Sequence, residues 1–127
     1  MRLRPGLCAT ATMVVSDVDT ALALRSGDVQ VLATPRVVGL AEEAAVHALS
    51  EALDDGQTTV GFRVQLDHLA PTPIGGEVVA EATLEAVESR RLTFRVSVND
   101  GRGLVAAGRI TRVVVDRERF LERTAGA

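Results

Sequence analysis

Polar and apolar residues alternate through most of the second half of the chain, and this alternation restricts the possible folds more than any other feature of the sequence. It runs through 57–70, 77–87, 92–98 and 103–115, with turn residues such as Asn99-Asp100-Gly101 between the segments. A period of two is typical of a β-strand that buries one face, so the sequence predicts four strands. The residues predicted to share the apolar face of the first are Thr58, Val60, Phe62, Val64, Leu66 and His68.

One long helical pattern precedes these strands. Thr34-Pro35 opens it, because Thr is a good N-cap and Pro suits the first helical position, where an N–H would have no partner. The pattern continues to about Leu53 and stops at Asp54-Asp55-Gly56. The other predicted elements are a first strand at 8–15, a polar connection at 17–30 with a short helical turn at 18–24, and a short charged helix after residue 116.

These elements come in the order strand, helix and four strands joined by short turns. Strands connected in this way form an antiparallel meander. One face of the sheet is apolar and only one long helix can cover it, so the helix must lie across that face in a two-layer α+β arrangement. A long central helix wrapped by a curved antiparallel sheet of about five strands is the hotdog fold. The 127 residues fit a single domain of this kind, residues 1–127.

The composition argues against several classes of function. The net charge is −3 and the only aromatic residues are three Phe, so the chain lacks the basic and aromatic surface that tracks nucleic acid. No window approaches 18 apolar residues, so no membrane-spanning segment is expected. Cys8, His47 and His68 are the only cysteine and histidines, so no metal site is expected. A single cysteine fits a reducing cytoplasm.

Glu42 fits the helical pattern least. On a helical wheel the polar arc consists of Arg36, Glu43, His47, Ser50, Glu51 and Asp54. The wheel neighbours of Glu42 are instead Val38, Val46, Leu49 and Leu53. A carboxylate on an apolar stripe is costly to bury unless it is paired or protonated, which makes Glu42 a candidate for chemistry. The alternatives are that Glu42 reaches past the stripe to water or forms a salt bridge at a dimer interface.

Two further polar residues leave structural and functional interpretations open. His68 has the apolar parity of its strand and lies at the strand end, just before a proline-rich break. A single histidine in such a place is more often a core or edge residue with a satisfied hydrogen bond than a catalyst. Thr34 has a structural explanation as the helix N-cap.

Several short fragments, each weak alone, become specific when they are taken in order. They are Val31-Leu32-Ala33-Thr34, Val38-Gly39-Leu40-Ala41-Glu42, Thr58-Thr59-Val60-Gly61, Asp67-His68 and Thr111-Arg112-Val113-Val114-Val115-Asp116. Together they resemble the fluoroacetyl-CoA thioesterase family, over about residues 10–122. The resemblance implies hydrolysis of an acyl thioester with Thr34, Glu42 and His68 as a catalytic triad.

The resemblance also implies a role for each residue. Thr34 would position the carboxylate or the attacking group, Glu42 would be the nucleophile or the base that activates water, and His68 would transfer protons. Gly61 would let the substrate approach the backbone, and Arg112 would lie near the acyl end or the subunit interface. No cofactor is expected apart from the coenzyme A of the substrate. Because a single hotdog domain has an open sheet edge and sites of the family lie at a two-fold interface, we expect a homodimer or higher oligomer.

One departure from the family concerns the substrate. The family has phenylalanines in the lid segment before the Thr, whereas residues 24–30 contain no aromatic residue and the three Phe lie at 62, 94 and 120. The expected substrate is therefore another small acyl-CoA, and fluoroacetyl-CoA itself is not expected. Two other classes remain open: a hydratase or dehydratase of the same fold, and a non-catalytic acyl-CoA-binding protein.

Overall fold

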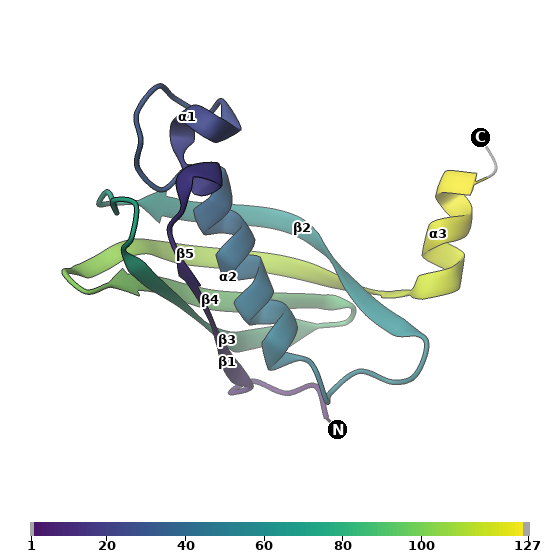
Figure 1. The fold of residues 1–127 in the computed structure, drawn as a ribbon. Coiled ribbons are helices and arrows are strands. Elements are labelled where there is room, and N and C mark those ends of the chain that lie inside the picture. Colours follow the sequence, from purple (N-terminus) through teal and green to yellow (C-terminus); the bar gives the residue numbers. More distant parts are fainter. Residues whose placement is uncertain (1, 126–127) are drawn as a thin grey trace.

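The computed structural model describes residues 2–125. Within them the chain forms a five-stranded sheet, one long helix and three short helical segments. The strands are β1 (Cys8–Val14), β2 (Gln57–His68), β3 (Glu77–Glu88), β4 (Arg91–Asp100) and β5 (Gly103–Asp116). The helical elements are the 3-10 helix η1 (Asp17–Asp19), α1 (Ala21–Leu24), α2 (Thr34–Ala48) and α3 (Arg117–Ala125). α2 lies across one face of the sheet, so the predicted α+β hotdog arrangement is confirmed (Figure 1).

The strands are antiparallel and follow the order β1-β3-β4-β5-β2 across the sheet. β3, β4 and β5 form the predicted meander, but β2 pairs with β5 and not with β3, so the predicted four-strand meander is wrong at this connection. The reason lies in residues 69–76, where Pro71 and Pro73 have no N–H to donate to a hairpin ladder. The chain instead crosses the sheet end, where the Leu32 N–H donates to the Thr72 carbonyl at 2.9 Å.

The core lies between α2 and the sheet. Alanines on the buried face of α2 allow its backbone to approach the strands closely, and the largest fully buried side chain opposite them is Phe94. Valine, leucine and alanine supply most of the remaining core, as the composition suggested. The side chains that α2 buries are Val37, Leu40, Ala41, Ala44, Ala45 and Ala48.

The long helix is shorter than predicted. It ends at Ala48 and not near Leu53, because the following hydrogen bonds connect residues three apart and tighten the chain into turns. These bonds run from the Leu49 N–H to the Val46 carbonyl and from the Ala52 N–H to the Leu49 carbonyl. The apolar residues of the turns still pack, since Leu49 and Ala52 are buried.

A β-bulge divides β2 into two halves. The pairing with β5 shifts between Gly61 and Arg63, which leaves Phe62 as the extra residue. Before the bulge, Gly61 lies opposite Arg112 and shares its face of the sheet, whereas after it the even-numbered residues face that side. The prediction of one apolar face from residue 58 to residue 68 is therefore wrong, because the period of two is interrupted. The residues of the second half that face α2 are Val64, Leu66 and His68.

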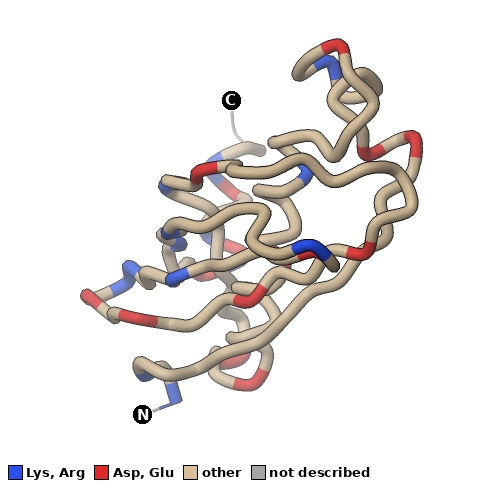
Figure 2. The backbone as a smooth tube through the Cα atoms, turned by 90° about the vertical axis from the view of Figure 1, so that its left-hand side faces the viewer, with Lys and Arg blue, Asp and Glu red and all other residues tan. Residues whose placement is uncertain are grey.

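β2 forms one edge of the sheet, and helical segments extend past both of its ends. α1 and the loop that follows it rise beyond β2 at the end that carries His68, and α3 rises beyond it at the opposite end (Figure 1). Charges of both signs are distributed over the chain, with most basic residues in the left half of Figure 2. None of the helices in residues 2–125 is long and apolar enough to span a membrane.

Candidate functional site

Glu42 lies at the border of the buried helix face and forms an ion pair with Arg112. Its side chain is 33% exposed, and on its side of the helix Val46 is 45% exposed, so the part of the predicted apolar stripe around Glu42 does not pack on the sheet, although Leu49 is buried. Arg112 Nη1 donates to Glu42 Oε2 at 2.9 Å. Arg112 also donates from Nε to Thr59 Oγ1 and from Nη2 to the Thr59 carbonyl, each at 2.9 Å. These three bonds fix the guanidinium and, through it, one oxygen of the carboxylate.

Burial dominates the electrostatics of Arg112. The residue is only 7% exposed, and this desolvation lowers the pKa of its guanidinium, while Glu42 acts in the opposite direction. An arginine remains charged under these conditions because its guanidinium keeps its proton far above neutral pH. A permanent positive charge therefore stands beside the Glu42 carboxylate.

Gly61 lies directly against the carboxylate. A Cβ at this position would stand 2.6 Å from Glu42 Oε2, much closer than any normal contact. A side chain on β2 at this position would therefore displace the Glu42 carboxylate. The Glu42 side chain thus occupies the space beside Gly61. The sequence had predicted that a substrate would approach the backbone there.

Thr34 and His68 form a second cluster. Thr34 Oγ1 and His68 Nδ1 are 2.7 Å apart. The predicted N-cap role of Thr34 is wrong: Ala33 is the N-cap, the helix begins at Thr34, and its hydroxyl makes no capping bond. Among the described residues, His68 Nε2 is buried without a hydrogen-bond partner. A buried polar group in this state costs about 1–3 kcal/mol, so Nε2 is positioned for a ligand or another chain to satisfy.

A cavity of about 350 Å³ opens beside this pair. Its walls come from the loop after α1 and from the segment that follows β2. Four polar side chains line it, namely Ser26, Asp28, Thr34 and His68. The cavity is large enough for a small acyl group next to the histidine.

The two clusters lie apart within one chain. Thr34 and Glu42 are eight residues apart on α2, which at about 1.5 Å per residue separates them by about 12 Å along the helix. The structure thus brings Thr34 to His68 and brings Glu42 to Gly61 and Arg112, but it does not bring the two groups together. Within residues 2–125, no three side chains of the His, Cys, Asp and Glu types gather to hold a metal ion.

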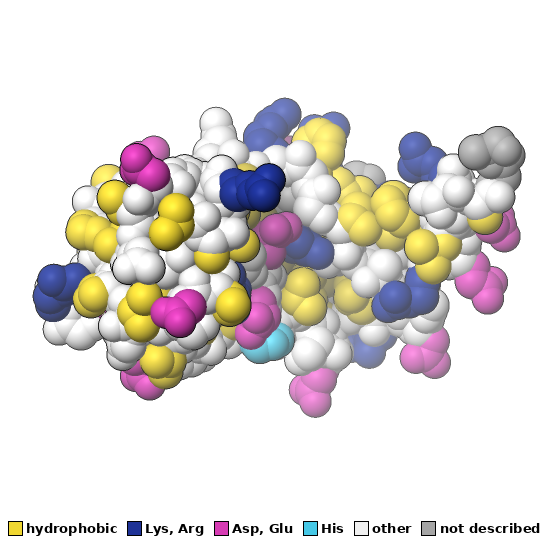
Figure 3. All heavy atoms as spheres, turned by 45° about the horizontal axis from the view of Figure 1, so that its top comes forward, with side chains coloured by type: hydrophobic (Ala, Val, Ile, Leu, Met, Phe, Trp, Pro, Cys, Tyr) yellow, Lys and Arg dark blue, Asp and Glu magenta, His cyan; other side chains and the backbone are white. Residues whose placement is uncertain are grey.

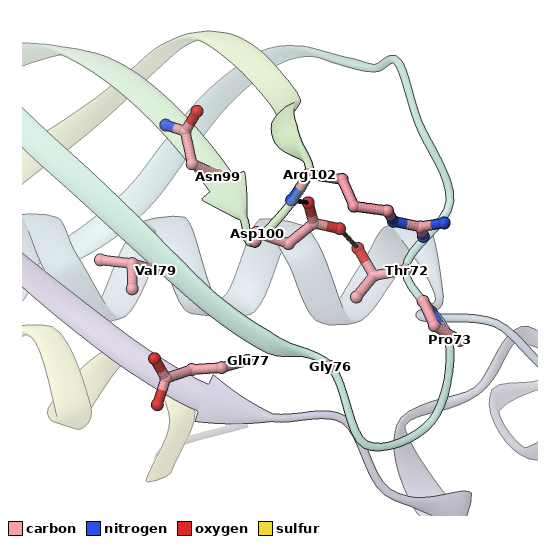
Figure 4. A pocket seen from close by; sticks show the side chains of 9 residues that line it. Thr72, Pro73, Gly76, Glu77, Val79, Asn99, Asp100 and Arg102 are labelled. Atoms are coloured by element: carbon pink, nitrogen blue, oxygen red, sulfur yellow. Dashed lines mark hydrogen bonds between the residues drawn. The ribbon is translucent and has the colours of Figure 1, made fainter.

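A second cavity, of about 430 Å³, lies between the segment after β2 and the β4–β5 hairpin (Figure 4). Hydrogen bonds within the chain account for Thr72, Asp100 and Arg102. Thr72 Oγ1 donates to Asp100 at 2.8 Å, and the Arg102 N–H donates to the other oxygen at 2.8 Å. These hydrogen bonds, with the Arg102 bond contributing most, lower the pKa of Asp100. Arg102 also reaches the Pro71 carbonyl at 3.0 Å. The cluster ties the segment after His68 to the β4–β5 hairpin. The sequence did not predict this cluster, although a threonine between two prolines is a signal of a constrained segment.

Known proteins resemble this chain over most of its length. Residues 15–118 match the family model described as fluoroacetyl-CoA-specific thioesterase. The fluoroacetyl-CoA thioesterase of Streptantibioticus cattleyicolor is 40% identical over 91 residues, which are 72% of this chain and 66% of that relative. A solved fluoroacetyl-CoA thioesterase structure superposes with a TM-score of 0.91 at 33% identity, covering 97% of this chain and 96% of the other. A thioesterase superfamily member from Thermus thermophilus gives 0.86 at 28% identity over the full length of both chains.

Proposed function

Because this chain belongs to the fluoroacetyl-CoA-specific thioesterase family, we propose that it hydrolyses an acyl-CoA thioester to a free acid and a thiol, with Thr34, Glu42 and His68 as its catalytic residues. The observation that carries the proposal is the Thr34–His68 contact of 2.7 Å at the mouth of a cavity. The Thr34 hydroxyl therefore bonds to the His68 ring instead of capping α2, and this bond orients the imidazole.

The chemistry follows from the fixed groups. Arg112 engages Glu42 Oε2, which leaves the lone pairs of Oε1 for water or for the acyl carbon. In the base route, Glu42 takes a proton from water as the water oxygen bonds to the carbonyl carbon, and the C–S bond then breaks. In the nucleophile route, Glu42 bonds to that carbon and the C–S bond breaks, and water then hydrolyses the resulting acyl anhydride to the free acid and the Glu42 carboxylate. In both routes His68 supplies the proton that the departing thiolate takes up. Neither route requires a metal or a cofactor beyond the CoA carried by the substrate.

We propose further that the protein is a homodimer joined along β2, in which each site combines groups from both subunits. β2 is an edge strand with apolar side chains in the open, since Phe62 is 49% and Val64 41% exposed. Figure 3 shows hydrophobic side chains gathered between the body of the molecule and α3, which lies at the right. An unpaired edge of this kind favours pairing with a second copy.

Two-fold symmetry would also bring the Thr34–His68 pair and Glu42 together, with each group coming from a different subunit. If two β2 strands pair antiparallel, the first half of one lies beside the second half of the other. Glu42 stands over Gly61 in the first half, whereas His68 is the last residue of the strand. The pairing would therefore carry the Thr34–His68 pair of one subunit toward the Glu42 of its partner.

Co-expression of Glu42→Ala chains with His68→Ala chains tests this arrangement. Each variant alone should be inactive. With random pairing, half of the dimers are mixed, and each mixed dimer has one site with both functional residues, so about one quarter of the wild-type activity should return. A triad contained within one chain would give no recovery. Light scattering of the wild type provides the mass, and a monomer would contradict the proposal.

The acyl group is proposed to be small and different from fluoroacetyl. The loop that lines the cavity contributes Ser26 and Asp28 but no aromatic side chain from residues 24–30. Of the phenylalanines, Phe94 is buried in the core, Phe62 lies beneath Arg91, and Phe120 belongs to α3. Thiol release from a panel of acyl-CoAs, with Glu42→Ala and His68→Ala as controls, identifies the preferred ester. Binding of the esters without cleavage would instead favour an acyl-CoA-binding protein.

A further inference from the structure

α3 packs only weakly on the rest of its chain, with Phe120 half-buried and the other side chains exposed. Within residues 117–125, all of which the structure describes, no side chain is buried, and Leu121 is 54% exposed. The hydrogen bonds that join it to the preceding chain lie at its start, where the Arg117 N–H donates to the Gly56 carbonyl at 2.9 Å and the Arg119 N–H to Asp116 at 3.1 Å. An isolated helix of nine residues is marginal in water, because helices shorter than about 12–15 residues rarely persist alone. The helix therefore needs a surface that one subunit does not provide.

An exposed apolar rim surrounds the cavity at the other end of β2. Its large side chains come from α1, from the loop after it and from the segment after β2. They are Leu22, Leu24, Val29 and Leu69, which are 50%, 43%, 54% and 59% exposed. A cluster of this kind on a soluble domain marks an interaction surface. Asp28 lines the cavity and Arg25 follows α1, whereas α3 carries three arginines, at 117, 119 and 123, and two glutamates, at 118 and 122.

α3 cannot reach this rim in its own subunit. The two features lie at opposite ends of β2, whose twelve residues span about 40 Å at about 3.3 Å per residue. Antiparallel pairing of two β2 strands would reverse this relation, because the Gln57 end of one strand then lies beside the His68 end of the other. Figure 1 shows that α3 and the α1 region both rise past β2, so both project toward the space of a partner.

We propose that α3 of each subunit packs over the Thr34–His68 cavity of the other subunit, with Leu121 against its apolar rim. This inference rests on the proposed β2 homodimer. α3 is then a cover that the partner subunit supplies to the cavity. It buries the rim, places arginines near Asp28 and shields the cavity from bulk water. Shielding strengthens the electrostatic interactions of the reacting groups.

Disulfide trapping tests the placement of α3. In a Cys8→Ser background, which removes the exposed native thiol, Leu121→Cys is combined in turn with Leu24→Cys, Val29→Cys or Leu69→Cys. A disulfide requires Cα atoms within about 7 Å, so a bond inside one chain is excluded and any product must link two subunits. Leu121→Cys with Val14→Cys is the matched control, because Val14 is 59% exposed but belongs to β1 at the opposite edge of the sheet.

We expect mild oxidation to convert most of at least one rim pair into a covalent dimer that reductant reverses, while the control remains monomeric on a denaturing gel. Light scattering of the reduced proteins separates the two possible failures. If the protein is a dimer and no rim pair links more than the control, α3 lies elsewhere and only this inference is overturned. If the protein is a monomer, the inference and the proposed dimer both fail.

Discussion

Replacing Gly61 by alanine tests the position of the Glu42 carboxylate with the smallest available change. The added Cβ would lie 2.6 Å from Glu42 Oε2 and 3.8 Å from Arg112 Nη1. Ordinary contact begins at 3.4 Å, so the carboxylate oxygen must retreat by 3.4 − 2.6 = 0.8 Å. Because the same oxygen accepts the Arg112 hydrogen bond at 2.9 Å, the ion pair must adjust with it.

This displacement should affect catalysis much more than stability. Misplacement of a reacting group by about 1 Å can cost about 100-fold in rate, so kcat/KM should fall by about 10- to 100-fold. The clash falls on the flexible end of a side chain, and the backbone of Gly61 is not in the left-handed region. Alanine is favoured over glycine in a strand by about 0.5–1 kcal/mol, so the free energy of unfolding should stay within about 1 kcal/mol of the wild type.

The assay is thiol release from the acyl-CoA that the wild type cleaves best. It is run in the Cys8→Ser background so that the exposed thiol adds no signal. Gly101→Ala is the matched control, since a Cβ there would meet nothing within 4 Å, and it should retain full activity. Activity of Gly61→Ala within twofold of the wild type, with an unchanged melting temperature, would show that turnover does not depend on where this carboxylate lies.

Four further substitutions test the fold around the site. Gly108→Ala places a Cβ 2.0 Å from the backbone oxygen of Gln65, so denaturant titration should show a loss of about 3 kcal/mol, and an unchanged midpoint would contradict the β2–β5 register. Phe94→Ala opens a cavity at a fully buried side chain and should cost about 3–5 kcal/mol in the same titration. Thr72→Val removes a 2.8 Å bond to Asp100 and should cost about 1–2 kcal/mol with activity retained. Since hydrogen bonds lower the pKa of Asp100 below its usual 3.8, its contribution to stability is present above pH 3.8 and is lost as the pH falls through the lower folded value. Melting curves of Asp100→Asn should therefore converge with those of the wild type in acid, and a constant gap would refute this linkage.

The alternating segments predicted the strands well, because each strand buries one face against a single helix. The bounds of β3, β4 and β5 agree with the sequence patterns to within a few residues. Pairing order was harder, because periodicity reports which face of a strand is buried and not which neighbour it meets. The bulge at Phe62 also has no signature in periodicity, since the residues on both sides of it are apolar at the same parity.

The site residues were recognisable, but their grouping was not. Glu42 was marked by its place among apolar wheel neighbours, and the structure gives the physical reason: Arg112, seventy residues later, supplies its partner. Nothing local in the sequence indicates that Arg112 turns inward, because a strand residue is placed by its register with neighbours. The bond between Thr34 and His68 was equally hard to predict. It depends on α2 beginning at Thr34, one residue earlier than an N-cap threonine would place the first helical residue.

The salt bridge considered for Glu42 was one at a dimer interface, whereas the Glu42–Arg112 pair lies within one chain, and its geometry bears on whether stability alone accounts for it. A partly buried ion pair is weak evidence for stability, because desolvation of both charges offsets much of their attraction, and apolar residues of similar volume often serve as well. Here Arg112 is 7% exposed, and the carboxylate further requires that β2 have no side chain at Gly61. Two apolar residues in place of the ion pair, with an ordinary side chain in place of Gly61, would fill the same space without burying a charge. The arrangement is explained if what matters is one oxygen held by a permanent cation while the other remains available to a substrate.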